Sequence, residues 1–454
     1  MIETDAPFLY NETADVVRLF DDPPDVRLSF SLRGDVFENT VRAGGREFVY
    51  TERQPFSGEI EYKRYARRFA KIAVYETLSS LTGQTMPWGA LTGIRPTKLA
   101  YAELEAGRDF VPLFEKCCVS EANIALIRRI LEEQKGIYAK ETGAADLYAG
   151  IAFCPSKCSY CSFITADITR TGKYADPYLC ALEKEIASCE GLFNKLRSVY
   201  VGGGTPFALD EKGLERVLKA LEPFARDVPE YTVEAGRPDV FTEGKLALLK
   251  EYGVDRICIN PQSFNGETLR AIGRNHTVGQ IYEAFSMAEK YGFSVNCDLI
   301  AGLPGETEKM FEKSVREAVA LAPDNITVHT LCLKKGAKLK EEEQRLRGGE
   351  IGSMIAYSRE ALGTAGYAPY YLYRQKYMAG NYENTGWCRK GTACVYNVDV
   401  MEETCDNIAC GANAVGKKIF HGEGRIERVG APKDIATYIA KIDTIIAEKK
   451  KLFG

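Results

Sequence analysis

Three cysteines stand close together near the middle of the sequence, in the stretch FCPSKCSYCSF at 153–163. Cys154, Cys158 and Cys161 have the spacing C-x3-C-x2-C. Three such thiolates can bind three irons of a four-iron four-sulfur cluster, which leaves the fourth iron without a protein ligand. An open coordination position is typical of a reactive metal site rather than a structural one. The spacing therefore predicts a reactive cluster and disfavours the alternatives, a zinc site or three unrelated thiols.

The elements around this motif alternate between apolar runs and helix-like stretches. We expect six strands, at 147–154, 196–204, 231–236, 256–263, 295–304 and 326–333. Strands that alternate with amphipathic helices predict βαβ units and a parallel sheet. Six units are fewer than the eight of a closed barrel, so we predict an α/β fold with an open, partial (β/α)6 barrel. The cysteines follow the first strand, where the catalytic loops of such a barrel gather.

Further polar or side-chain-free residues stand at or near the ends of successive strands. The segment GGGTP ends the second strand, and its glycine backbone lets a polar cofactor approach closely. The candidate residues are Gly202, Gly203, Gly204 and Thr205, followed by Glu234, Gln262, Arg274 and Asp298. Each polar residue alone could be a satisfied group at the barrel rim, but their repeated placement favours a shared site.

The cysteine spacing after the first strand of a partial barrel resembles the radical S-adenosylmethionine superfamily. The resemblance implies that the unique iron binds the amino and carboxylate groups of the cofactor, and that one electron cleaves it to methionine and a 5′-deoxyadenosyl radical. It further implies that GGGTP contacts the methionyl end of the cofactor. A one-electron reductant such as flavodoxin or ferredoxin is the partner expected for such an enzyme.

Residues 146–340 are similar to one branch, the oxygen-independent coproporphyrinogen III dehydrogenase family. The shared features are GGGTP, a glutamate on strand three, a glutamine followed by an arginine, and DLI-GLP. The resemblance makes the eight strand-end residues candidate S-adenosylmethionine contacts. It also suggests that Phe163, the last residue of the cysteine motif, forms an aromatic wall beside the adenine. A fourth thiol at that position is not needed to bind the cluster.

The two ends of the chain resemble the HemZ-type branch of that family, through LTGIRPTK at 91–98 and YYLYRQKYMAGNYENTGW at 370–387. The expected activity is oxidative decarboxylation of coproporphyrinogen III to protoporphyrinogen IX in anaerobic heme biosynthesis. A heme chaperone, and radical methylation with ring opening of heme, remain alternatives. The chaperone branch has a His-Asn pair where this chain has Glu383 and Asn384, so the obvious axial iron ligand is missing.

The four propionates of this tetrapyrrole are anions and need cations to bind them. Arginine offers a bidentate fork to a carboxylate, and lysine offers a point charge. The candidate cations are Arg95, Lys98, Arg237, Arg374 and Lys376. No catalytic residue beyond the cofactor contacts can be named from the sequence.

The organisation of the chain predicts three parts. Residues 1–145 show alternating strands and a basic helix and predict an α+β domain, 146–345 form the barrel, and 346–454 form a region that covers the substrate. The net charge of −4 gives no global attraction to nucleic acid, and the basic helix is expected to be a solvated face. No apolar run is long enough to span a membrane, and the acidic start is not a leader, so we expect a cytoplasmic protein.

The chain holds 14 cysteines, and disulfides are improbable in the cytoplasm. Four are expected to be small buried residues in apolar stretches: Cys180, Cys258, Cys297 and Cys332. Four near the C-terminus have spacings that match no common ligand pattern: Cys388, Cys394, Cys405 and Cys410. We expect no metal role for either set.

Overall fold

The structure is a computed structural model that describes residues 1–92, 95–161, 166–332, 348–375 and 378–454. Its contacts divide the chain into two compact units. The first comprises Met1–Arg128 with Tyr373–Glu383, and the second Arg129–Leu372 with Asn384–Gly454. The three-part organisation predicted above stays a prediction. Among the described helices, none is both long and apolar enough to cross a membrane.

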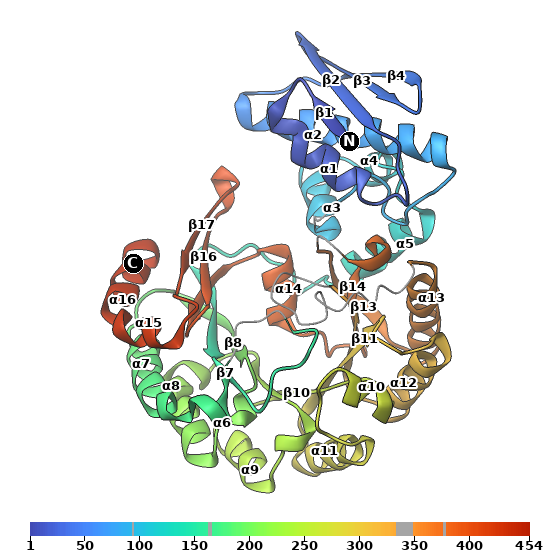
Figure 1. Cartoon of the computed structure of the whole chain (residues 1–454). Helices are drawn as coiled ribbons and strands as arrows, with labels where there is room; N and C mark the ends of the chain where they lie inside the picture. The colour runs from blue at the N-terminus through green and yellow to red at the C-terminus, as the bar shows by residue number, and fades with distance from the viewer. Residues whose placement is uncertain (93–94, 162–165, 333–347, 376–377) are drawn as a thin grey trace. The chain divides into compact units, whose positions relative to one another are not determined.

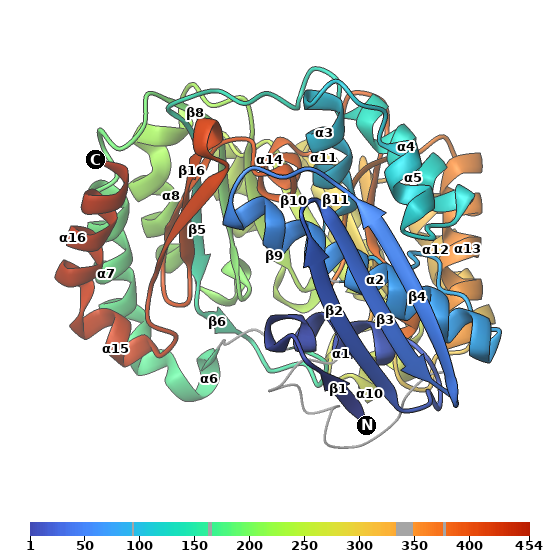
Figure 2. The ribbon, with the colours of Figure 1, turned by 90° about the horizontal axis from the view of Figure 1, so that it is seen from above.

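The first unit contains a sheet in the order β1-β2-β3-β4. These strands are Ile2–Thr4, Val26–Arg33, Val36–Ala43 and Arg46–Arg53, with β1 parallel to β2 and the others antiparallel. Helices α1 (Tyr10–Val17) and α2 (Glu59–Thr82) lie against the sheet (Figures 1 and 2). Phe37 of β3 is fully buried, with its ring centroid 5.3 Å from that of Phe69 in α2. Helices α3 (Pro96–Glu105), α4 (Val111–Lys116) and α5 (Glu121–Glu133) follow.

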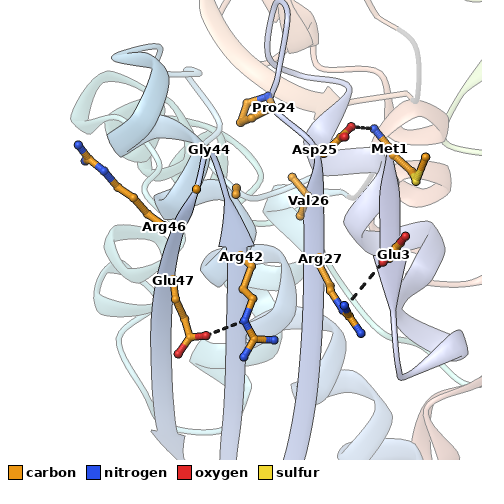
Figure 3. A pocket seen from close by; sticks show the side chains of 12 residues that line it. Met1, Glu3, Pro24, Asp25, Val26, Arg27, Arg42, Gly44, Arg46 and Glu47 are labelled. Atoms are coloured by element: carbon orange, nitrogen blue, oxygen red, sulfur yellow. Dashed lines mark hydrogen bonds and ion pairs between the residues drawn. The ribbon is translucent and has the colours of Figure 1, made fainter.

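A surface hollow of about 740 Å³ lies at one end of this sheet (Figure 3). Two of its arginines face carboxylates across neighbouring strands. Arg42 Nε lies 2.6 Å from Glu47 Oε2, and Arg27 Nε lies 3.9 Å from Glu3 Oε2. Because these pairs are exposed and cancel in charge, we place no functional site in the hollow.

The second unit is built on parallel strands that follow one another along the chain. Strands β5, β8, β9, β10, β11 and β12 lie side by side in that order, each parallel to the next. They span Ala144–Ile151, Lys195–Gly203, Tyr231–Gly236, Arg256–Gln262, Ser294–Ala301 and Asn325–Thr330. Strand β8 is buried from Leu196 to Gly202, as expected where helices cover one face and side chains fill the other.

Helices connect these strands and lie outside the curved sheet (Figure 1). They are α7 (Ala175–Ala187), α8 (Glu211–Ala225), α9 (Glu243–Glu251), α10 (Gly266–Ala271), α11 (Val278–Tyr291) and α12 (Glu308–Ala320). Helix α8 illustrates how the sequence forms these helices. The side chain of Asp210 caps its start by accepting from the amide of Gly213 at 2.8 Å. Its buried apolar residues recur every three or four positions, at Leu214, Val217, Leu218 and Leu221.

The sheet continues beyond these strands at both edges. Strand β15 (Asp406–Cys410) pairs parallel with the outer side of β5, and the hairpin of β16 (Val415–Phe420) and β17 (Arg425–Gly430) extends it. At the other edge, β14 (Asn384–Cys388) pairs antiparallel with β12, and β13 (Ala368–Tyr373) follows. The 11-stranded sheet of the described residues is open, because β13 and β17 form its two ends.

Four further helices belong to the C-terminal region: α13 (Gly348–Thr364), α14 (Val395–Glu402), α15 (Ile435–Ala440) and α16 (Ile442–Phe453). Helix α14 packs against β8, where Asp399 accepts two hydrogen bonds, of 2.6 and 3.1 Å, from Arg197. The predicted α/β class and partial barrel are confirmed, and each predicted strand has its counterpart. The edge strands and α14 were not predicted.

Candidate functional site

The cysteine loop follows β5 at the carboxyl end of the parallel strands. Cys154 ends the short strand β6 (Phe153–Cys154). Cys158 is 8% exposed, and the amide of Cys161 donates to its carbonyl at 3.2 Å. The amide of Ser159 donates to the carbonyl of Ile272, at the end of α10, at 3.0 Å. The structure therefore places all three cysteines in one loop, which is hydrogen-bonded to the segment after α10.

The glycine segment lies directly against this loop. Gly203 has a φ of 100°, and a Cβ added to Gly204 would lie 2.3 Å from the carbonyl oxygen of Phe153. Both positions therefore require glycine. The hydroxyl of Thr205 lies 3.6 Å from the sulfur of Cys154, and its amide donates to Phe153 at 2.8 Å. The glycines therefore leave the backbone beside Cys154 without side chains, so a cofactor could approach it closely.

A carboxyl group stands inside the barrel one strand further along. Glu234 of β9 accepts from the Tyr200 hydroxyl at 2.6 Å and from the amide of Gly203. The pKa of Glu234 is raised to about 7: burial is the main cause and the charge of Asp298 adds to it, while the Tyr200 bond and His329 oppose the shift. The group is thus poised to change protonation near neutral pH.

Strands β11 and β12 add a second polar pair to the interior. His329 Nε2 of β12 lies 3.7 Å from Oδ2 of Asp298 in β11. The ring of Tyr200 stacks on Tyr396 of α14 at 4.1 Å and on Tyr148 of β5 at 6.2 Å. The sequence analysis missed these tyrosines and His329. No local pattern marked the tyrosine pair, because Tyr200 lies in the continuously buried part of β8 and Tyr396 lies on helix α14.

Gln262 ends β10 in a strained position. Its φ is 69°, unusual for a residue with a side chain, and the register shifts between Ile259 and Gln262. Its Oε1 is buried without a hydrogen-bond partner. Strain and an orphaned buried acceptor are both features of binding sites that a ligand completes.

Arg274 is buried beside the cysteine loop. One terminal nitrogen donates to the Tyr160 hydroxyl at 3.1 Å, the other contacts the Asn260 carbonyl, and the guanidinium hydrogen-bonds Cys158. Burial disfavours its charge, but Tyr160 and Cys158 outweigh burial and raise the pKa of Arg274. It therefore places a fixed positive charge next to the second cysteine.

Two arginines predicted to bind substrate propionates have other partners. Arg237, after β9, is 3% exposed and donates to Asp239 and to Ser156. Arg374, in the first unit, is 5% exposed and donates to the carbonyls of Leu91, at 2.5 Å, and Asn381, at 3.0 Å. Both predictions are corrected, because each guanidinium is buried among protein acceptors.

The other predicted contacts have mixed outcomes. Phe163 and Lys376 lie outside the described residues, so the predictions for them stay as they were. Arg95 and Lys98 are half-buried at the start of α3 in the first unit and stay candidates.

Several other cysteines have described neighbours elsewhere in the second unit. Cys258 and Cys297 are buried as expected, but Cys332 is only partly buried, and Cys180 on α7 is exposed. The four C-terminal thiols have four different neighbours: Glu133 for Cys388, Glu230 for Cys394, Asp146 for Cys405 and Cys189 for Cys410.

Asp146, Asp399 and Cys405 are a group of possible ligands close enough together to hold a metal ion. However, Asp399 is engaged by Arg197, whose Nε lies 2.6 Å away. A cation at this position would have to displace the arginine from its carboxylate.

The residues at the carboxyl ends of β5 to β11 fit a thiolate-bound cluster with a nucleoside cofactor. Three cysteines share a loop, and a Cβ at Gly203 or Gly204 would clash with the backbone that leads into this loop. The unpaired Oε1 of Gln262 and the carboxyl groups of Glu234 and Asp298 can accept from amino and hydroxyl groups.

Comparison with known proteins identifies the family. The model of the radical SAM superfamily matches residues 148–318. Oxygen-independent coproporphyrinogen-III oxidase-like protein HemZ of Bacillus subtilis (strain 168) is 35% identical over 421 residues, which cover 87% of this chain and 83% of that protein. The heme chaperone HemW of Lactococcus lactis subsp. lactis is 35% identical over 231 residues, covering 49% of this chain and 60% of that protein.

Among solved structures, coproporphyrinogen III oxidase (HemN) from Escherichia coli, a radical SAM enzyme, superposes with a TM-score of 0.55. The match covers 68% of this chain and 71% of that one, at 22% identity, and so supports the fold. The chain therefore belongs to the radical SAM superfamily, and within it to the family of oxygen-independent coproporphyrinogen-III oxidase-like HemZ proteins, with a 4Fe–4S cluster and S-adenosylmethionine as cofactors.

Proposed function

We propose that this protein is a cytoplasmic coproporphyrinogen III dehydrogenase that converts two propionates of its substrate to vinyl groups in anaerobic heme biosynthesis. The observation that carries the proposal is the extent of its similarity. The alignment with the HemZ oxidase-like protein covers 87% of the chain, whereas the alignments with HemW heme chaperones of several bacteria cover 41% to 62% of it. The similarity to the oxidase-like protein therefore extends well beyond the part that the chaperone shares.

In this proposal, Cys154, Cys158 and Cys161 each bind one iron of the cluster. Around them, side chains and side-chain-free backbone hold S-adenosylmethionine: Phe163, Gly202, Gly203, Gly204, Thr205, Glu234, Gln262, Arg274 and Asp298. When bound, the cluster and the cofactor together supply a hydrogen-abstracting 5′-deoxyadenosyl radical, with the electron delivered by a flavodoxin or ferredoxin.

The chain's own residues then have distinct tasks. The carboxyl groups of Glu234 and Asp298 would accept hydrogen bonds from the cofactor's hydroxyls, and the contacts of Tyr200 with Glu234 and of His329 with Asp298 would orient them. The buried strands around the site would limit the access of water to the bound cofactor and substrate. For each vinyl group formed, the substrate loses one hydrogen atom, one molecule of carbon dioxide and one electron, which passes to a one-electron acceptor.

The positions of two candidate iron ligands favour the dehydrogenase over a heme chaperone. Glu383 stands where the chaperone branch has histidine, and it is buried, accepting from Trp88 Nε1 at 2.8 Å. His276 is buried beside Asp239, with its Nδ1 4.0 Å from Oδ1. Neither position presents an imidazole to a heme iron.

Anaerobic incubation tests the proposal. The reconstituted protein is supplied with coproporphyrinogen III, S-adenosylmethionine, a reductant and an electron acceptor, and mass spectrometry follows the tetrapyrrole. We expect products that have lost one and then two carboxyl groups. Cofactor consumption with heme but not with porphyrinogen would support the ring-opening reaction instead. Tight heme binding without turnover of either substrate would support the chaperone.

A further inference from the structure

Arg237 lies beneath the segment that separates the first two cysteines. Its guanidinium donates through Nη1 to the Oγ of Ser156 at 2.5 Å and to the Ser156 carbonyl at 3.4 Å. Ser156 stands between Cys154 and Cys158, so these bonds hold the loop where two predicted cluster ligands must be set at a fixed spacing. The side chain of Arg237 is 3% exposed, which excludes a role as a surface cation.

A carboxylate fixes this arginine in turn. Asp239 accepts two hydrogen bonds from Arg237, of 3.0 Å from Nε and 2.7 Å from Nη2. Burial opposes ionisation of Asp239, but the bonds and charge of Arg237 outweigh it and hold the pKa of Asp239 below its ordinary value. Next to this pair, burial lowers the pKa of His276 to about 3, so that the imidazole adds no charge. The guanidinium of Arg237 and the carboxylate of Asp239 therefore form a rigid support whose charges cancel.

We propose that Arg237, held by Asp239, is a positioning residue for the iron–sulfur cluster, because it fixes Ser156 and so presets the spacing of Cys154 and Cys158 before iron binds. The inference rests on the assignment of the cluster to the cysteine loop. Groups that hydrogen-bond to a metal-binding loop hold its ligands in the binding geometry, so less conformational entropy is lost when the metal binds. Their loss weakens metal binding roughly 10- to 100-fold. Arg237 acts on the cluster through Ser156 and not on the substrate.

The matched control is Arg197, at the opposite end of the strands. It is also buried, it also donates twice to one aspartate, Asp399, and it also reaches a backbone carbonyl, that of Ile137 at 2.6 Å. Arg237→Gln and Arg197→Gln thus remove comparable buried pairs, and only the first lies against the cysteine loop. Ser156→Ala is a milder second variant, since it removes the Oγ contact and keeps both arginines.

The experiment measures the release of iron from anaerobically reconstituted protein to an excess of chelator, together with the thermal midpoint of each variant. We expect Arg237→Gln to release iron roughly 10-fold faster than wild type or more, and Ser156→Ala to fall between them. Arg197→Gln should lower the midpoint while its release rate stays near that of wild type. The electron paramagnetic resonance signal of the reduced cluster should change in Arg237→Gln and not in Arg197→Gln.

Equal release rates and unchanged resonance signals in the two arginine variants would show that Arg237 only stabilises the fold, and would overturn this inference alone. A wild-type protein that takes up no cluster would overturn the cysteine assignment itself, and the inference with it.

Discussion

Tyr200 Oη donates a 2.6 Å hydrogen bond to Oε1 of Glu234, and this contact joins β8 to β9 inside the barrel. It fixes the direction of a carboxyl group whose pKa burial raises to about 7 from an ordinary value of 4.5. The charge of Asp298 adds to this rise. A candidate cofactor contact therefore titrates in the range where the protein would work.

This titration predicts how cofactor affinity depends on pH. If cofactor hydroxyls donate to Glu234, binding favours the carboxylate, which the cofactor-free protein holds fully only above the raised pKa. The affinity of the cluster-containing protein for S-adenosylmethionine should therefore rise about 10-fold between pH 6 and pH 8. Calorimetric titration across this range measures it, and Glu234→Gln should give a weaker and flat profile.

Glu306 provides the control for this experiment. Burial raises its pKa to about 7 as well, and hydrogen bonds from Ser263 and Asn265 oppose the rise. In the unfolded chain it ionises at lower pH, so it lowers stability as pH rises from about 4.5 to about 7. Glu306→Gln should therefore flatten the pH dependence of stability while the affinity profile keeps its slope. An affinity profile that Glu234→Gln leaves unchanged would remove Glu234 from the cofactor site.

The cluster assignment predicts that each of the three cysteines is indispensable. Cys154→Ala, Cys158→Ala and Cys161→Ala should each abolish the visible thiolate–iron absorbance and the cleavage of S-adenosylmethionine, because each thiolate is expected to bind one iron. Cys180→Ala is the control, since this thiol is exposed on α7. Iron analysis and absorbance spectra measure the outcome. A full four-iron cluster in any of the three variants would show that its cysteine is not a ligand.

The glycine segment predicts a steric effect. Gly204→Ala should strongly reduce cluster content and cofactor binding, because its Cβ would lie 2.3 Å from the Phe153 oxygen and would push the cysteine strand away. Gly363→Ala, in α13, is the control, since nothing lies within 4 Å of its added Cβ. Iron content and equilibrium dialysis of labelled cofactor measure both. Normal cofactor binding by Gly204→Ala would mean that the loop can shift without cost.

Arg374 is predicted to stabilise the first unit. Its guanidinium contacts buried acceptors of Leu91 and Asn381 and lies 5.2 Å from the centre of the Trp88 ring. Arg374→Met should lower the free energy of unfolding by about 3 kcal/mol, because it leaves buried acceptors unpaired. Urea unfolding followed by Trp88 emission, in a Trp387→Phe background, measures the change.

Arg53→Met is the matched control within the same unit, because the Arg53 side chain is 76% exposed. Its effect should stay within about 0.5 kcal/mol. If Arg374→Met instead unfolded like wild type and lost only turnover of the tetrapyrrole, Arg374 would return to the list of substrate contacts.

Local patterns in the sequence were sufficient to predict the barrel and the core of the candidate site. Each apolar run encodes a buried strand by itself, and the cysteine spacing and the GGGTP segment lie within short stretches. The addition of β15 to β5 was not predictable in this way. It depends on register between segments more than 250 positions apart, such as Ala145 opposite Asp406.

The partners of side chains were harder to predict than their positions. Arg237 was a reasonable candidate for a carboxylate, and it does bind one, but that carboxylate is Asp239, two residues away. The nearby acidic residue was a signal that sequence reasoning passed over. The stacking of Tyr200 on Tyr396 at 4.1 Å joins a strand to a helix far along the chain, and no local pattern reveals such a contact.

The most direct test of the proposed function follows the abstracted hydrogen. Coproporphyrinogen III deuterated at the β-carbons of its propionates is incubated anaerobically with the reconstituted protein, S-adenosylmethionine, reductant and electron acceptor. Mass spectrometry of the nucleoside product then shows the origin of its hydrogen. We expect one deuterium in each 5′-deoxyadenosine, with carbon dioxide released in equal amount. Undeuterated 5′-deoxyadenosine with unchanged porphyrinogen, or none formed at all, would contradict the assignment as a coproporphyrinogen dehydrogenase.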